Sequence, residues 1–128
     1  MPRMVDSEGN EQTTRGFATR SVVIGSGQSL SGEVDLEGFA LVGIVMPAAW
    51  TAAVLSFAAA AASGGTFNPV YDDAGTEVTV QAAASRAIGV DVVAVALAAF
   101  RFLKLRSGTA GAPVAQVGDR TITLVVKG

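Results

Sequence analysis

The feature that most constrains the fold is a run of 34 residues, from Gly38 to Tyr71, that contains no charged side chain. A membrane-spanning helix needs about 20 mainly apolar residues in one continuous helix. Here Pro47 interrupts the run near its middle, and the residues that flank the run are acids instead of the lysines and arginines that orient a span: Glu33, Asp35, Glu37, Asp72 and Asp73. We therefore expect this run in the interior of a domain or at an interface, with no membrane partner.

The composition predicts one domain with a thin polar coat. Half of the 128 residues are hydrophobic and only 16% are charged, so the chain is long enough to bury a single core. Because a domain of this size has a large surface for its volume, so few charges indicate that other subunits cover part of that surface.

Composition also excludes several classes of function. A formal charge of −2 provides no field that would gather a polyanion, so we expect no nucleic acid partner. The absence of cysteine excludes disulfides and thiolate chemistry. The first sixteen residues, "MPRMVDSEGNEQTTRG", lack the apolar stretch of a secretory signal, so we expect the protein to fold in a cytoplasm.

The chain divides into an arm and a β-domain. Residues 1–16 are mostly polar and are expected to form an extended N-terminal arm. Residues 17–128 consist of short apolar stretches with glycine every eight to twelve residues, which is typical of a sandwich or barrel. We expect strands at 17–24, 30–37, 39–46, 54–60, 66–71, 76–81, 86–90, 100–106 and 121–126.

The predicted fold class is an all-β jelly-roll β-sandwich of about eight or nine antiparallel strands with at most one short helix. The helix is expected in "DVVAVALAAF", with Asp91 as its N-cap. In "EVDLE" and "TITLVVK" apolar residues alternate with polar ones, which indicates one solvated face. In "FRFLKLR" the alternation shifts phase, which predicts a β-bulge at Phe102–Leu103.

The stretch "FALVGIVM" does not alternate, since apolar residues occupy both of its faces. A strand of this kind is either covered on both sides within its own domain or packed against another subunit. The sequence leaves both alternatives open.

Residues that carry common chemistry are missing. The chain has no histidine, which is the commonest general base and metal ligand. Asp72, Asp73 and Glu77 lack the spacing of a calcium loop and form either a tight turn or a weak cation site. The glycine pairs are not followed by a helix with lysine, so they do not predict a phosphate loop. We expect no enzymatic activity, no cofactor and no metal.

Three aromatic residues and two arginines are the candidate interface residues. Trp50 either plugs one end of the core, anchors an interface or stacks on a sugar, and Phe67 and Tyr71 flank Pro69 in a position suited to the last two roles. Arg3 and Arg15 lie on the arm. The acids at 33–37 and 72–77 complement the bases at 86–106, either within one sheet or between copies of the chain.

Three blocks of the sequence carry a resemblance to known proteins. They are "MPAAWTAA-L-F", the "YDDAGTEV" turn and the "R-LK-RSGT…RTITL" ending, and over about residues 21–128 the chain resembles small structural proteins of tailed bacteriophages. A looser resemblance is to galactose-binding-like jelly rolls. The sequence departs from the phage pattern at "AAAAASGGTF" and "DVVAVALAAF", which lack the polar groups that a sugar site needs.

The phage resemblance implies a non-enzymatic virion protein, a head decoration or cement protein made in the host cytoplasm and located on the outer capsid surface. It implies two partners, the major capsid protein and further copies of the chain in a homotrimer. The alternatives are a carbohydrate-binding module of a head or tail fibre and a tail-tube or connector protein.

Overall fold

The computed structural model describes residues 4–5, 11–12, 16–90 and 92–128. In the N-terminal segment, β1 (Met4–Val5) pairs with β2 (Glu11–Gln12) in a two-stranded sheet of its own. The boundary between arm and domain at residue 16 remains a prediction. The other elements are β3 (Phe17–Ile24), β4 (Val34–Asp35), β5 (Ala40–Val45), β6 (Leu55–Ala60), β7 (Asn68–Pro69), β8 (Thr79–Val80), β9 (Ala87–Gly89), α1 (Val92–Leu97), β10 (Phe102–Ser107) and β11 (Arg120–Lys127).

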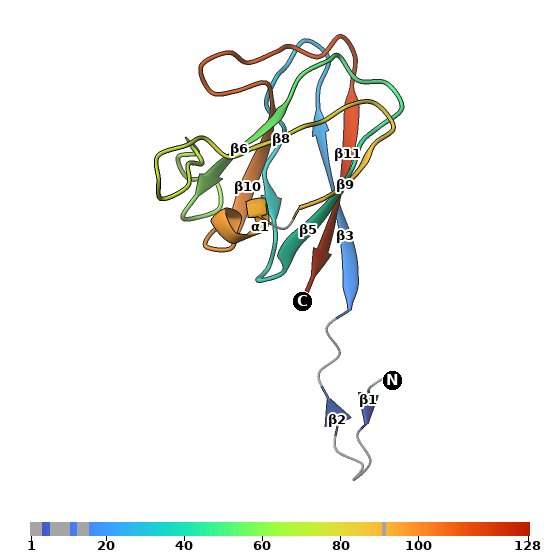
Figure 1. Cartoon of the computed structure of the whole chain (residues 1–128), viewed down its shortest axis with the longest axis vertical. Helices are drawn as coiled ribbons and strands as arrows, with labels where there is room; N and C mark the ends of the chain where they lie inside the picture. The colour runs from blue at the N-terminus through green and yellow to red at the C-terminus, as the bar shows by residue number, and fades with distance from the viewer. Residues whose placement is uncertain (1–3, 6–10, 13–15, 91) are drawn as a thin grey trace.

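These elements form a β-sandwich with jelly-roll topology (Figure 1). One sheet has the order β3-β11-β5-β9, and the other has the order β4-β10-β6-β7 with β8 also paired to β6. The pairing is nested, because β3 pairs with β11, β4 with β10, β5 with β9 and β6 with β8, always antiparallel. Nested pairs that alternate between two sheets define a jelly roll, so the predicted fold class is confirmed.

The core lies between the two sheets and is built by the alternating strands. On β11, Ile122, Leu124 and Val126 are fully buried, while Thr121 and Lys127 are exposed. Strand β6 is buried at every position and places Phe57 at the centre of the core. The alanines that follow Phe57 continue the strand, as predicted, and no described helix is long and apolar enough to cross a membrane.

The predicted bulge at Phe102–Leu103 is wrong. Strand β10 pairs residue by residue with β6 from Phe102 to Ser107, without a shift of register. Phe100 precedes the strand and packs partly against the core from the loop, while Phe102 lies on the outward face. The two phenylalanines therefore share no strand face, and no extra residue is needed.

A bulge occurs instead on β5, in the stretch that did not alternate. The register with β11 shifts between Val125 and Val126, so that Val42 is left without a Cα partner on β11. This extra residue allows both Leu41 and Ile44 to point into the core although they are three positions apart.

The strand predicted at 76–81 is reduced to Thr79–Val80, with an isolated bridge at Glu77, and two other predicted strands are shortened in the same way. In residues 30–37 only Val34–Asp35 forms a strand, with an isolated bridge at Leu30, and in residues 66–71 only Asn68–Pro69 does, with a bridge at Tyr71. Both segments contain loop residues whose backbone bonds go to other partners, such as the Leu36 N–H to the Arg101 carbonyl (2.8 Å). Single backbone bonds still tie both segments to a neighbouring strand: the Ser31 N–H donates to the Leu105 carbonyl of β10 (2.8 Å), and the Val70 N–H donates to the Phe57 carbonyl of β6 (2.9 Å).

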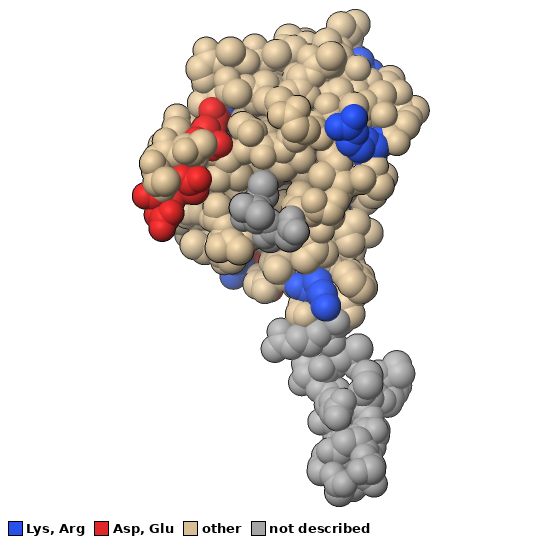
Figure 2. Space-filling view, viewed as in Figure 1, with Lys and Arg blue, Asp and Glu red and all other residues tan. Residues whose placement is uncertain are grey.

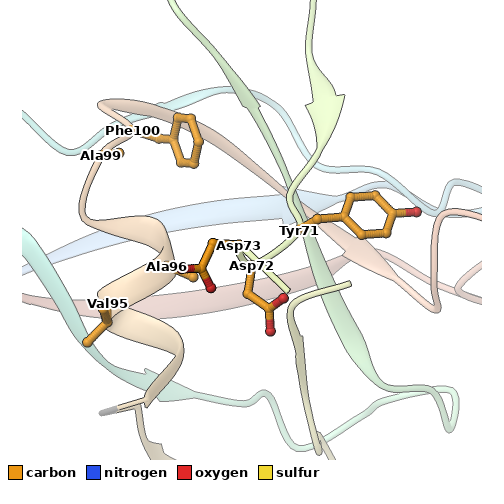
Figure 3. A pocket seen from close by; sticks show the side chains of 7 residues that line it. All are labelled: Tyr71, Asp72, Asp73, Val95, Ala96, Ala99 and Phe100. Atoms are coloured by element: carbon orange, nitrogen blue, oxygen red, sulfur yellow. The ribbon is translucent and has the colours of Figure 1, made fainter. Parts of the chain in front are cut away.

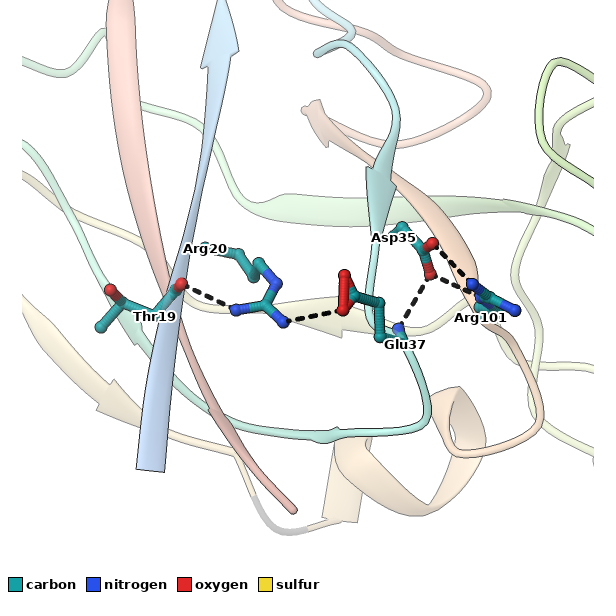
Figure 4. Close-up of polar contacts among 5 residues, drawn as sticks. All are labelled: Thr19, Arg20, Asp35, Glu37 and Arg101. Atoms are coloured by element: carbon teal, nitrogen blue, oxygen red, sulfur yellow. Dashed lines mark hydrogen bonds and ion pairs between the residues drawn. The ribbon is translucent and has the colours of Figure 1, made fainter. Parts of the chain in front are cut away.

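Ion pairs within the chain account for much of the charge complementarity (Figure 4). Arg101 Nε lies 2.7 Å from Asp35 Oδ1 and its Nη2 lies 2.9 Å from Oδ2. Arg20 Nη2 lies 3.6 Å from Glu37 Oε2, and Arg106 Nη1 lies 3.7 Å from Glu77 Oε2. The acidic and basic segments are thus neighbours within one molecule.

The Asp35–Arg101 pair predicts a pH dependence of stability. The hydrogen bonds from Arg101 hold the pKa of Asp35 below its ordinary value of 3.8. A carboxyl group whose pKa is lowered on folding stabilises the fold above its unfolded pKa, and this contribution is lost as the pH falls through the folded pKa. In thermal melts between about pH 6 and pH 2, we expect Asp35→Asn to lose less stability below about pH 4 than the natural chain. Parallel curves would contradict this role of the pair.

Candidate functional site

The outer face of the β3-β11-β5-β9 sheet is unusually poor in charge. Cross-strand register places the following outward positions together on it: Phe17, Thr19, Ser21, Val23, Gly43, Val45, Ala87, Gly89, Thr121, Thr123, Val125 and Lys127. Lys127 is the single charged residue of this set, and its Nζ lies 5.4 Å from the centre of the Phe17 ring. Among the described residues of these four strands, the outer face therefore carries one charge.

Large apolar side chains are exposed on this face. Phe17 is 68% exposed, Val23 48% and Val45 44%. A hollow of about 370 Å³ lies on this face, and its lining includes Phe17, Gly43, Val45 and Val125. An outer sheet face normally carries polar side chains that keep it solvated, so this face has the character of a contact surface. Of the two alternatives for "FALVGIVM", packing against another subunit is the one that this geometry favours.

A second hollow, of about 800 Å³, lies between α1 and the turn that follows Tyr71 (Figure 3). Its walls are mainly apolar and include Val95 and Ala96 from α1, Phe100 from the following loop and Tyr71. In Figure 3 the carboxyl groups of Asp72 and Asp73 lie between Tyr71 and the helix. A neighbouring groove also has Tyr71 and Phe100 in its lining, so the two hollows lie next to each other.

The carboxylates beside this hollow serve the turn. Asp72 Oδ1 accepts hydrogen bonds from the backbone N–H groups of Ala74 (3.0 Å) and Thr76 (2.9 Å), which closes an Asx turn. The structure describes no group of three or more acidic side chains that could hold a metal ion. Figure 2 shows acidic side chains gathered at one side of the molecule, while most of the surface in that view is uncharged. For the segment at 72–77, the tight turn is the alternative that the geometry supports.

The structure separates the predicted interface residues. Trp50 is partly buried against the core and its Nε1 donates to the Ala53 carbonyl (3.1 Å), which is the arrangement of a plug. Phe67 lies under Lys104, whose Nζ is 4.6 Å from the ring centre. Tyr71 is 51% exposed and lines the hollow. Arg3 and Arg15 lie outside the described residues.

Sequence reasoning missed this charge-poor face, because its members are mostly threonine, serine, glycine, alanine and valine. None of these residue types suggests a site by itself. The signal was available in part, since residues that alternate with the core positions of β3 and β11 must point outward. What the sequence lacked was the register that brings the outward positions of four strands together.

Comparison with known proteins finds a similar fold among the solved structures. No family model and no curated protein sequence matches this chain. Among solved structures, the chain is similar to the SPBc2 prophage-derived protein YomS, with a TM-score of 0.51 and 12% sequence identity, over 91% of this chain and 99% of YomS. At that identity the likeness shows a shared β-sandwich architecture.

Proposed function

We propose that this chain is a non-enzymatic structural protein of a bacteriophage virion, and specifically a decoration protein that binds the outer head surface and stabilises contacts between capsomers. The observation that carries the proposal is the outer face of the β3-β11-β5-β9 sheet, whose only charged residue in the described part of the chain is Lys127. A small domain that leaves Phe17, Val23 and Val45 exposed on one such face is suited to assembly with other protein surfaces.

The carboxylates of the described region support a structural role over a catalytic one. Glu33 accepts hydrogen bonds from Ser63 (2.6 Å) and from the Gly64 N–H (2.8 Å), and these bonds lower its pKa and fasten the loop after β6. Asp35 holds Arg101, and Glu77 accepts from the Ala110 N–H (2.9 Å). Each of these acids stabilises a particular loop or strand end, which is the use expected in a building block.

The phage assignment draws support from two likenesses. The sequence resembles small structural proteins of tailed phages, and the architecture resembles that of a prophage-derived protein. The proposed partners are the major capsid protein and further copies of the chain, in the homotrimer that the resemblance implies. The proposed location is the outer capsid surface.

The copy number of the chain per particle tests the proposal. We expect quantitative gel densitometry of purified virions to give a ratio to the major shell protein of about one, or a simple fraction such as about one third, because a decoration protein follows the symmetry of the lattice. A tail protein measured in the same lanes controls for particles that have lost their tails. A handful of copies would contradict decoration and would favour a tail or fibre role, in which the hollow beside Tyr71 becomes a candidate sugar site.

A further inference from the structure

Strand β3 leaves one edge of the sandwich open. It is eight residues long and pairs with β11 on one side, and no other described strand pairs with it. The opposite edge of the same sheet is β9, which has only three residues. An open strand edge presents unpaired N–H and C=O groups that can pair with another chain. Strand β3 is therefore the longer of the two edge strands of this sheet.

The backbone groups at this edge can be assigned. The Gly128 N–H donates to the Gly16 carbonyl (3.2 Å), so residue 16 directs its backbone groups toward the β11 side. Because these directions alternate along an antiparallel strand, Phe17, Thr19, Ser21 and Val23 direct theirs toward the open edge. The Thr19 carbonyl accepts a bond from its neighbour Arg20 (3.1 Å), and its second lone pair can accept another (Figure 4).

The outward side chains along this edge form a symmetric pattern. Phe17 and Val23 are apolar and exposed, Thr19 and Ser21 carry hydroxyl groups, and the four positions are centred on Arg20. When such a strand pairs antiparallel with a copy of itself around its centre, each apolar residue faces an apolar residue and each hydroxyl faces a hydroxyl.

We propose that β3 pairs antiparallel with β3 of a second copy, around a two-fold axis at Arg20, and joins two four-stranded sheets into one sheet of eight strands. In this register Phe17 of each copy faces Val23 of the other, and Thr19 faces Ser21. Aromatic with β-branched pairs and threonine with serine pairs both stabilise antiparallel sheets. All four residues have edge-directed backbone groups, so these are the pairs that exchange hydrogen bonds.

The register brings the two copies of Arg20 opposite one another on the inward face. Like charges in that position oppose pairing. Each guanidinium, however, already lies 3.6 Å from Glu37 and 5.3 Å from the centre of the Phe39 ring, so two carboxylates accompany the two cations. The opposing charges thus lower the affinity of the pair without excluding it.

The β3–β3 contact joins two copies of the chain and no more, because it contains a two-fold axis. In a homotrimer it would lie between neighbouring trimers. The inference rests on the edge of β3 and is independent of the proposed capsid role, since it is tested on the purified chain alone. Failure of the particle measurement would leave it standing, and the reverse also holds.

Disulfide trapping tests the register. The natural chain has no cysteine, so introduced thiols are the only ones present. We expect differently tagged Thr19→Cys and Ser21→Cys chains to cross-link with each other upon mixing and oxidation, because residues that face each other lie within the reach of a disulfide. Each variant alone should cross-link at least fivefold less. Equal or stronger cross-linking of either variant with itself, or no cross-linking, would overturn the proposal.

Charge variants test the contact itself by sedimentation equilibrium. The natural chain is expected to form dimers, or pairs of trimers, and T19K/S21K to weaken that pairing at least tenfold. T19K/S21E should retain it, because each lysine then faces a glutamate of the other copy only in this register. The control T121K/T123K places charges on the same outer face but on the central strand β11, and should pair normally.

Two results would overturn the proposal by this route. One is a monomer, or a trimer that does not pair, for the natural chain at about 100 μM. At that concentration even copies that associate weakly form complexes. The other is pairing that resists T19K/S21K or that T121K/T123K abolishes, since the latter result would indicate face-to-face packing. Circular dichroism and thermal melts of each variant show whether the fold is intact.

Discussion

Replacing Gly108 by alanine is expected to destabilise the fold by about 3 kcal/mol or more, the sum of backbone strain and overpacking. Gly108 has a φ of +90°, a conformation that residues with a Cβ rarely adopt. A Cβ at this position would lie 2.5 Å from the Ala112 carbonyl oxygen and 2.8 Å from the Val114 nitrogen. Both are backbone atoms, so no side chain can move aside.

The backbone of Gly108 cannot shift easily either. Its N–H donates to the Val54 carbonyl (2.7 Å), and its carbonyl accepts from the buried Ser56 hydroxyl (2.7 Å). These bonds hold the end of β10 against the start of β6. A displacement of Gly108 would therefore break contacts between these two paired strands.

Urea unfolding of Gly108→Ala beside Gly111→Ala isolates this effect. Gly111 lies in the same loop, has no positive φ and has nothing within 4 Å of the position of a Cβ. The control is expected to stay within about 0.5 kcal/mol of the natural chain. Similar midpoints for the two variants would show that the loop relaxes around the new methyl group.

The sequence predicted most strand positions because the alternation of apolar and polar residues follows from burial of one face. Strand β3 has the predicted bounds, and β11 extends the prediction by one residue at each end. Alternation failed where two explanations of a phase shift compete. Phe100 and Phe102 shift phase because the strand begins after Phe100, whereas Leu41 and Ile44 shift phase because of a bulge. Only the register with the neighbouring strand distinguishes these cases.

The surface features were harder to predict than the core. Trp50, Phe67 and Tyr71 drew attention by residue type, yet the structure places Trp50 against the core and Phe67 under Lys104. The charge-poor face and the open edge of β3 depend on the order of the strands in the sheet. That order follows from nested pairing between segments as far apart as β3 and β11, and no local pattern encodes it.

Replacing Gln116 by leucine is expected to cost about 3 to 5 kcal/mol of stability, because the buried Ser107 hydroxyl and the partly buried backbone groups of Thr51 would lose their partners at about 1 to 3 kcal/mol each. The Gln116 side chain is fully buried. Its Nε2 donates to the Thr51 carbonyl (2.9 Å) and the Ser107 hydroxyl (2.7 Å), and its Oε1 accepts from the Thr51 N–H (2.8 Å) and from Arg120 (3.1 Å).

Leucine fills a similar volume, so the loss would come from these hydrogen bonds and not from a cavity. Gln81→Leu is the matched control, because Gln81 is exposed and its substitution is expected to change stability by less than about 0.5 kcal/mol. Urea unfolding curves of the two variants provide the comparison. If Gln116→Leu were as stable as Gln81→Leu, water would have to reach Thr51 and Ser107 and replace the lost hydrogen bonds.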